Sequence, residues 1–480
     1  MKKSINIVFL LLALASGIAG CQKSFLEVTP AGKIIAEKTN DYNLLLNSLT
    51  LGNQFMTHSQ AMGDEMAAIE PYYSGITLQQ QRSFQWEDNI YEPNEDAPEI
   101  TYPTKALYVY NVVINEVLNS TGGTAGEKEA LQAEALAGRA WVYLQLVNTF
   151  AKPFNSATAA TDPGFPIVKE ANVTMNSFPR ATVKEVYDFI VDDLKAAIPN
   201  LSPTPYHRFR MSRPAAEALL GKTYLFMGMY NEALEQLTAA MTDLAASTYP
   251  VRLYDYNITF GPGGQFLPVT IFGPTLPNLY NNEESLYSRQ TMGDWTTASN
   301  ALPLSPATVA LYGQSDLRRN FMSTIPYPSG AAFPLGMARK AGPFSPIIGM
   351  VVPDIYLMRA EVKARLNDLP GAKADIEALR VKRMPAADAP VPDAISTNKN
   401  TLVKFILEER IREFAGLGYR WFDMRRLSVD PDFKSTVNTK HIVYSATGEA
   451  QSTFTLRPER LTFKIPPKVL SQNPGMVDNQ

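Results

Sequence analysis

Several aromatic residues lie in two segments of this chain that show no regular periodicity, at about residues 52–104 and 245–350. The aromatic candidates are Trp295, Trp86, Tyr73, Tyr72 and Tyr280, and the polar residues near them in sequence are Asn281, Asn282, Arg289 and Asp294. An aromatic ring offers a flat apolar face, and amides and charged groups can bond to hydroxyl groups. This combination suits the binding of a sugar, so we predict that these residues include a ligand-binding site.

Adjacent carboxylates occur at Asp64–Glu65 and at Asp192–Asp193. Either pair could supply half of the machinery of a glycoside hydrolase. That chemistry needs two carboxyl groups held ~5–9 Å apart, a separation that sequence spacing does not fix. Charged side chains of this kind usually face water, so we interpret both pairs as parts of solvated faces.

No motif for nucleotide, metal or nucleophilic chemistry is complete. Residues 216–223 end in Gly-Lys-Thr, as a phosphate-binding loop does, but they lack its first glycine and lie in a predicted helix. The histidines, His58, His207 and His441, are isolated in the sequence and show no metal-ligand spacing. The sequence therefore contains no complete motif for a metal, a cofactor or a catalytic nucleophile, and we predict no metal and no cofactor.

The N-terminus has the features of a lipoprotein signal peptide. A short basic start precedes an apolar run at residues 5–15, which is too short to cross a bilayer, since a spanning helix needs about 20 residues. Small residues then lead to Cys21, the only cysteine of the chain. We predict that residues 1–20 are removed and that Cys21 becomes the lipidated anchor.

The composition is typical of a globular protein that does not bind nucleic acid. Hydrophobic residues make up 45% of the 480 residues, an ordinary content for a packed core. The formal net charge is −3, and it becomes −5 when Lys2 and Lys3 leave with the signal peptide. An acidic chain without a basic block is a poor partner for nucleic acid. The 35 prolines and 28 glycines indicate long ordered loops.

Three helices are predicted in the first half of the chain. The first covers about Glu129–Phe150, where apolar residues recur at helical spacing. The second covers about residues 182–198, with Glu185 placed to complete a capping box. The third begins near Ser212, with Pro214 in its first turn.

The third helix opens a segment with the spacing of a tetratricopeptide repeat. Small and large residues follow the pattern of two closely packed antiparallel helices at Leu220, Gly221, Tyr224, Gly228, Tyr230, Ala233, Leu237 and Ala240. A weaker echo occurs at Tyr356, Ala360, Ala372, Ile376 and Leu379. We expect helix pairs separated by long insertions, and a late β-hairpin made of residues 453–456 and 461–465.

A strongly charged helix is predicted at about Leu402–Ala415, and two glycines end it. Glu408 and Glu409 lie four and three residues before Arg412. Pairs at these spacings stabilise a helix surface by a few tenths of a kcal/mol each. We expect both pairs on the exposed face.

Four segments of the chain form a recognisable set. They are the mature start Cys21–Pro30, the helix Ala133–Ala140 with Tyr143 and Phe150, the motif Leu407–Gly416 followed by Trp421–Arg426, and the closing residues Pro466–Pro467 and Gln472–Gly475. In type and order they resemble the SusD/RagB family of outer-membrane nutrient-binding lipoproteins.

The resemblance implies a mainly α, SusD-like fold, in which tetratricopeptide-like helix pairs form a scaffold and long loop insertions with a few short strands form a ligand-binding face. It implies one domain at residues 21–480, with an N-terminal part (21–244), a loop-rich insertion (245–350) and a C-terminal part (351–480). It also implies a lipid-anchored cell-surface protein of the outer membrane. Such a protein is not an enzyme, and it captures oligosaccharides and delivers them to a SusC-like TonB-dependent transporter.

Two alternatives remain open. A lid of the same kind of importer could bind peptides, although few charges lie near the candidate aromatics. An extracellular glycoside hydrolase is the other alternative, and an assay for reducing sugars would distinguish it from a binding protein.

Overall fold

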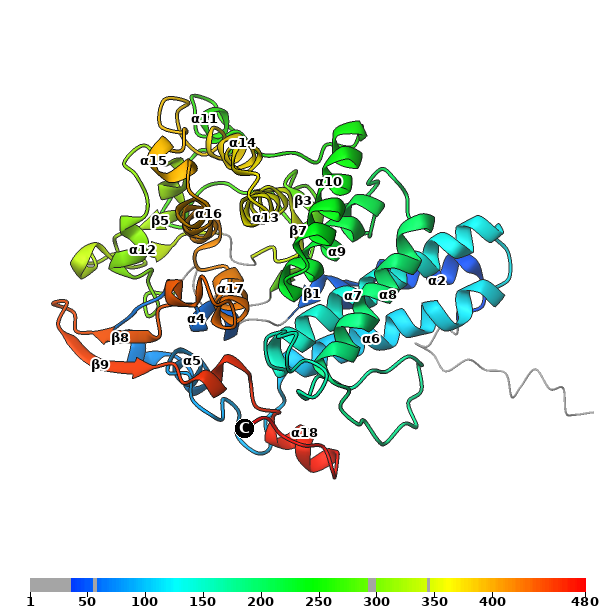
Figure 1. Cartoon of the computed structure of the whole chain (residues 1–480). Coiled ribbons are helices and arrows are strands. Elements are labelled where there is room, and N and C mark those ends of the chain that lie inside the picture. The colour runs from blue at the N-terminus through cyan, green and yellow to red at the C-terminus, as the bar shows by residue number, and fades with distance from the viewer. Residues whose placement is uncertain (1–35, 55–57, 292–298, 343–345) are drawn as a thin grey trace, which may run out of the picture.

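Long helices carry the fold, and the β8–β9 hairpin lies at its edge, whereas β3 and β7 lie between the helices (Figure 1). The computed structural model describes residues 36–54, 58–291, 299–342 and 346–480. The long helices are α6 (Pro98–Glu116), α7 (Ala125–Phe150), α8 (Val183–Ala197), α9 (Arg213–Met227), α10 (Tyr230–Ala246), α13 (Val352–Arg365), α14 (Leu369–Arg380), α16 (Lys399–Phe414) and α17 (Tyr419–Ser428). The predicted mainly α fold with few short strands is confirmed.

Shorter elements connect these helices. The short helices are α2 (Thr39–Leu45), α3 (Leu49–Gly52), α4 (His58–Met62), α5 (Leu78–Phe84), α11 (Tyr256–Thr259), α12 (Pro306–Ala310), α15 (Asp393–Ser396) and α18 (Pro467–Gln472). The strands are β1 (Asn53–Gln54), β2 (Ala68–Ile69), β3 (Ser285–Tyr287), β4 (Gln290–Thr291), β5 (Met322–Ser323), β6 (Arg339–Lys340), β7 (Met350–Val351), β8 (Lys440–Tyr444) and β9 (Ala450–Thr455). β1 pairs with β4, β3 with β7 and β5 with β6, and β8 lies between β2 and β9.

Local signals in the sequence set the starts of the main helices. Thr182 and Glu185 form the expected capping box at the start of α8. α7 begins earlier than predicted, because Thr124 and Glu127 form a second capping box there. Such a box satisfies backbone N–H groups that have no partner within the helix.

Consecutive helices pack as pairs: α6 with α7, α7 with α8, α9 with α10, and α13 with α14. In the α9–α10 pair, a Cβ atom at Gly221 would lie 2.7 Å from Cγ of Leu237. The glycine therefore permits the close approach that the repeat spacing predicts. Gly228 ends α9 in the left-handed conformation, in which glycine is not strained.

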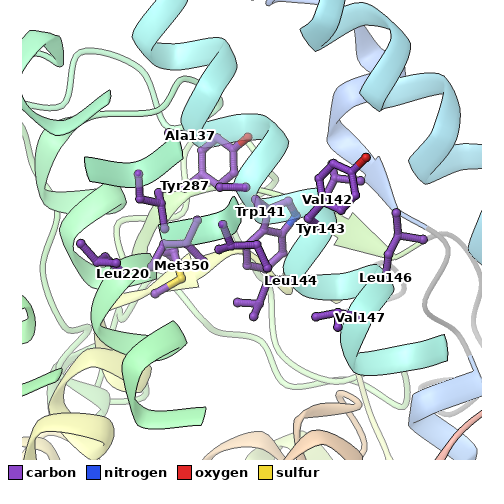
Figure 2. Packing of buried hydrophobic residues seen from close by; sticks show 14 of the residues in the cluster. Ala137, Trp141, Val142, Tyr143, Leu144, Leu146, Val147, Leu220, Tyr287 and Met350 are labelled. Carbon is purple, nitrogen blue, oxygen red and sulfur yellow. The ribbon is translucent and has the colours of Figure 1, made fainter. Parts of the chain in front are cut away.

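The largest part of the core forms where α7 meets α9 and the β3–β7 pair. Figure 2 shows Trp141 and Leu144 of α7 beside Leu220 of α9, with Tyr287 and Met350 from the two strands. All five side chains are buried. Trp141 is thus a core residue.

Between α10 and α13 the described residues form only short helices and strands. The loop that follows α14 holds this region in place by backbone hydrogen bonds. Tyr256 N donates to the Lys382 carbonyl at 2.8 Å, and Leu317 N donates to the Arg383 carbonyl at 2.9 Å. The insertion is thus attached to the C-terminal helices.

The predicted late hairpin has a different partner strand. β9 covers the predicted residues 453–455, but it pairs with β8, not with residues 461–465. The turn between β8 and β9 is closed by Ser445 N, which donates to the Glu449 carbonyl at 2.8 Å. Residues 461–465 instead run against the end of α7, where Phe463 N donates to the Thr149 carbonyl.

The charged helix α16 also differs from expectation in the face that carries its ion pair. Glu409 and Arg412 do pair, at 2.8 Å, but both side chains are buried. Arg318 and Arg380 approach the same Glu409 carboxylate at 2.7 Å each. The pair therefore belongs to a buried network and not to the exposed face.

Within the described ranges, no helix combines the length and the apolar character that a membrane span requires.

Candidate functional site

Two of the predicted aromatic residues, Trp86 and Tyr73, are buried in a stack of rings. The Trp86 and His441 ring centres are 3.7 Å apart, and Trp86 Nε1 donates to the Met62 carbonyl at 3.0 Å. The His441 ring is also stacked on Phe84, which meets Tyr73 edge to face. These contacts correct the prediction for both residues, because their rings pack the interior.

The structure also contradicts the prediction that Arg289 binds a ligand. Its guanidinium lies 3.7 Å from the centre of the Tyr287 ring, and it donates to the Tyr110 hydroxyl and to the Phe209 carbonyl at 3.0 Å each. The side chain is buried. Arg289 therefore holds β3 and its neighbours together and is not available to a ligand.

The other candidates do not form one site among the described residues. Trp295 and Asp294 lie outside the residues that the structure describes. Tyr280 and Tyr72 are exposed on separate parts of the surface: Tyr280 lies beside the loop before α9, and Tyr72 lies beside β2. Asn282 lines a cavity in the insertion, and it is the one described candidate that joins the site proposed below.

The paired carboxylates are mostly engaged inside the protein. Asp193 accepts from Arg139 Nε at 2.8 Å, and Asp64 accepts from Arg420 Nε at 2.6 Å. Glu65 is buried, and burial, followed by repulsion from Asp64, raises its pKa to about 8. The expectation of solvated faces is therefore wrong for these three residues.

A buried chain of polar residues has the residue types of a catalytic triad. His58 lies between Ser83 and Glu99, with Nδ1 2.7 Å from the Ser83 hydroxyl and Nε2 3.0 Å from Glu99 Oε1. A nucleophile must reach its substrate. Ser83, however, is completely buried, and its hydroxyl donates to the Gln79 carbonyl at 2.6 Å. The arrangement is a satisfied network in the core.

Two exposed rings of the insertion, Phe272 and Tyr327, stand side by side. Their centres are 5.1 Å apart with an angle of 45° between the planes. The side chains are 47% and 38% exposed. Phe272 lies at the tip of a tight turn, in which the backbone groups of Thr270 and Gly273 bond to each other at 2.9 Å. We refer to Phe272 and Tyr327 as the aromatic pair.

Two polar side chains, the buried Arg339 and the partly exposed Asn300, hold the aromatic pair in place. Arg339 of β6 donates to the carbonyl of Ile271, next to Phe272, and to that of Ile325 at 3.1 Å. Asn300 accepts from Tyr327 N and donates to the Tyr327 carbonyl, both at 2.8 Å. Two loops far apart in sequence are thereby fixed beside each other.

A cavity of about 500 Å³ adjoins the aromatic pair, because Phe272 also forms part of its wall. Phe266 contributes a further aromatic side chain, and Asn278 and Asn282 contribute amides. Lys340 of β6 lines the same cavity. A volume of this size, with apolar walls and a few polar groups, is typical of small-ligand sites.

Charged residues form one wall of the cavity and are tied to one another. Arg318 and Glu413 pair at 3.0 Å, and Glu284 and Glu413 each pair with Arg383 at 2.7 Å. Burial would raise the pKa of Glu413, but Arg383 and Arg318 hold it below its usual value. These groups shape the wall without leaving a free carboxylate pair of the kind that glycoside hydrolysis requires.

A helical scaffold that presents exposed aromatic rings beside a small cavity defines a protein built for binding. Comparisons with known proteins agree with this class. A family model described as "starch-binding associating with outer membrane" matches residues 24–225, and one described as "SusD family" matches residues 352–480. The chain therefore belongs to the SusD/RagB family.

Solved structures share the fold at low sequence identity. A SusD superfamily protein from Bacteroides thetaiotaomicron is 17% identical, with a TM-score of 0.70 over 92% of this chain and 100% of that one. A putative sugar binding protein from Bacteroides vulgatus is 18% identical, with a TM-score of 0.67 over 93% and 99%. Surface glycan-binding protein A from Bacteroides uniformis is 16% identical, with a TM-score of 0.67 over 92% and 99%. A search of curated proteins gives no match.

Sequence reasoning missed Phe272, Tyr327 and Lys340. A local signal for the two aromatics exists, because each stands among turn-forming residues, Phe272 before Gly-Pro and Tyr327 between two prolines. Aromatics at such positions are placed at loop tips and so tend to be exposed. No comparable signal marks Lys340, whose position depends on the β5–β6 pairing.

Proposed function

We propose that this protein captures glycans at the cell surface and delivers them to a SusC-like TonB-dependent transporter. The observation that carries the proposal is the exposed aromatic pair, Phe272 and Tyr327, at the edge of the cavity. Two further facts support it. The chain belongs to the SusD family, and its fold matches two proteins whose names refer to sugar or glycan binding.

The site has the two kinds of group that sugar binding uses. The aromatic pair offers flat apolar surface, and Asn278 and Asn282 offer donors and acceptors for hydroxyl groups. Each aromatic contact contributes ~0.5–1.5 kcal/mol beyond the burial of area. With a few hydrogen bonds, the expected affinity is millimolar to micromolar, about −4 to −8 kcal/mol.

Membrane attachment and transport complete the proposal. Cys21, which lies outside the described residues, would carry the lipid that holds the protein on the outer membrane. A lipid-anchored binder does not itself move a sugar across a membrane, and the transporter barrel supplies that step. The protein would cover the barrel as a lid and raise the local concentration of glycan above it.

A glycan array followed by calorimetry tests the binding step. The intact lipoprotein in detergent is compared with Phe272→Ala and Tyr327→Ala, and Tyr108→Ala serves as a matched control because Tyr108 is similarly exposed on α6. We expect the first two changes to weaken binding about tenfold at most, and the control to leave it unchanged. Equal affinities for all four proteins would show that the aromatic pair does not bind the glycan.

Two further measurements separate this proposal from its alternatives. Release of reducing sugar from a bound glycan would indicate a hydrolase, and binding of peptides without glycans would indicate a peptide importer.

Purification of tagged protein in mild detergent should recover a transporter barrel, through an interface above ~2,000 Å². Recovery of the protein alone at low salt would count against a stable complex. Cys21→Ala should leave a protein that is either soluble or retained in the inner membrane, and surface labelling of the variant would contradict the lipid anchor.

A further inference from the structure

Lys340 is a buried cation that faces the cavity without a counterion. Its residue is only 6% exposed, and its side chain lines the cavity wall. Its ammonium lies 5.6 Å from the centre of the Phe321 ring. Among the residues that the structure describes, the ion pairs include no partner for Lys340.

The neighbouring charges do not compensate it, because they compensate one another. Four arginines and four carboxylates form a closed network along this wall: Arg318, Arg380, Arg383 and Arg412 with Asp316, Glu284, Glu409 and Glu413. The network is balanced without Lys340. Glu65 is a further carboxylate near the lysine, but its pKa of about 8 leaves it mainly protonated, and so uncharged, at neutral pH. The lysine therefore adds one uncompensated positive charge to the cavity.

A second buried lysine, Lys222, has the carboxylate partner that Lys340 lacks. Lys222 is as deeply buried, at 8% exposed, and its ammonium lies 3.0 Å from the Asp354 carboxylate. A buried charge without a partner is costly, and proteins normally pair it. An uncompensated lysine on a cavity wall is thus best accounted for by an anion that enters from outside.

One strand carries both the lysine and the arginine that positions the aromatic pair. β6 consists of Arg339 and Lys340, and consecutive side chains of a strand point to opposite faces. Arg339 holds the backbone beside Phe272, whereas Lys340 lines the cavity. Because Phe272 lines the same cavity, one ligand can contact the ring and the ammonium.

We propose that the cavity is a subsite for an anionic sugar residue, either a uronate or a sugar sulfate ester, whose single negative charge is received by Lys340. This inference rests on the proposed glycan-binding function and names the class of glycan. Burial, partly offset by Glu413, lowers the pKa of Lys340 to about 8, while Arg318 lowers it further and Glu65 raises it. The lysine is therefore mainly protonated at neutral pH.

The test compares acidic oligosaccharides with their neutral counterparts on the intact lipoprotein. The panel contains uronate and sulfated oligosaccharides, each beside the same chain after carboxyl reduction or desulfation, and trialanine as a carboxylate without a sugar ring. The variants are Lys340→Met, which removes the charge at similar size, and Lys340→Arg, which keeps it. Lys195→Met is the matched control, because Lys195 is exposed on α8.

We expect at least one acidic oligosaccharide to bind about tenfold tighter than its neutral counterpart. Lys340→Met should remove this preference without abolishing neutral binding, and Lys340→Arg and Lys195→Met should keep it. Neutral glycans that bind without any acidic preference would overturn the inference and leave the proposed function intact. A preference that survives in Lys340→Met would also overturn it.

Two further outcomes are decisive. If trialanine binds as well as the uronates, the ligand is not a sugar acid. If the wild-type protein binds no glycan of either kind, both the inference and the proposed function fail. Thermal unfolding shows whether each variant folds. If Lys340→Met does not fold, the comparison of acidic with neutral oligosaccharides on the wild-type protein still tests the inference.

Discussion

The ion-pair cluster around Asp354 and the cavity wall at Lys340 treat buried charge in different ways. In the helices, Asp354 accepts from both Lys222 and Arg410, and Arg410 pairs in turn with Asp423. Burial alone would raise the pKa of Asp354, but Lys222 and Arg410 lower it. In the insertion, Lys340 is buried without such a partner.

The difference indicates which charges serve the fold and which are free to serve a ligand. A closed set of ion pairs leaves no charge for anything outside the protein, and its removal acts on stability. An open buried charge lowers stability and can gain a partner on binding. Substitutions of the two kinds of charge should therefore differ in their effects on the free energy of unfolding and on glycan affinity.

Removal of one member of the closed set of ion pairs should have the largest effect on the free energy of unfolding. Arg410→Met leaves Asp354 and Asp423 each short of a buried partner, which should reduce the free energy of unfolding by about 3–5 kcal/mol. Urea denaturation of the purified protein measures this change. Lys340→Met is the comparison, and it should leave stability unchanged or slightly higher. If both variants lose stability equally, the distinction between the two regions does not hold.

Glu65 should show a pH-dependent effect of somewhat smaller size. Its pKa is about 8 in the folded protein against an ordinary value of 4.5, so the folded state holds the proton more tightly. The associated stability is fully present below pH 4.5 and is lost as the pH rises to 8. Glu65→Gln should therefore stabilise the protein by up to about 3 kcal/mol at pH 7.

The measurement for Glu65 is unfolding of both proteins between pH 4 and pH 9. The stability difference should be close to zero at pH 4, should grow with pH, and should level off above pH 8. A difference that stays constant across this range would mean that Glu65 does not titrate with a raised pKa.

Arg339→Met should act on the insertion alone. It removes the hydrogen bonds to the Ile271 and Ile325 carbonyls, and each bond to a charged group contributes about 1.5–3 kcal/mol. Because these bonds fix the aromatic pair, glycan affinity should fall as well. Hydrogen exchange should increase in residues 268–273 and 323–328 and remain unchanged in α16. Faster exchange throughout the protein would instead make Arg339 a general core residue.

The smallest effect is expected for an exposed ion pair. Lys184 and Asp188 pair at 2.6 Å on α8, with side chains 55% and 46% exposed. Water screens pairs that are this exposed, so they contribute little to stability. Lys184→Met should therefore change the urea midpoint very little, and the small change should disappear in high salt. A loss as large as that of Arg410→Met would contradict the ranking.

Much of the scaffold could be predicted because its signals are local. Thr182 and Glu185 identify a helix start through a contact made within one turn. The spacing around Gly221 identifies a close helix pair, because only a small residue tolerates Leu237 so near. Trp141 follows from its place on an apolar helix face. The helix α6 was missed because its sequence contains an internal proline and gives only a weak amphipathic pattern.

The candidate site could be predicted only in part. The choice of the insertion as the binding region, and of Asn282 within it, agrees with the site proposed from the structure. Trp86 and Tyr73 look like exposed loop aromatics in the sequence, yet both are buried. Their burial depends on β8, which brings His441 against Phe84 and Trp86 from the other end of the chain.

By itself, the sequence determined the helical scaffold, the family motifs and the candidate signal peptide, because spacing, capping and composition act over short distances. The tertiary structure decided which aromatic rings stay exposed and which charges stay open. Phe272 and Tyr327 become a pair only because Arg339 and Asn300 join their loops. Lys340 becomes an open charge only because the surrounding arginines and carboxylates pair among themselves. Such contacts join residues far apart in the chain, so no local pattern records them.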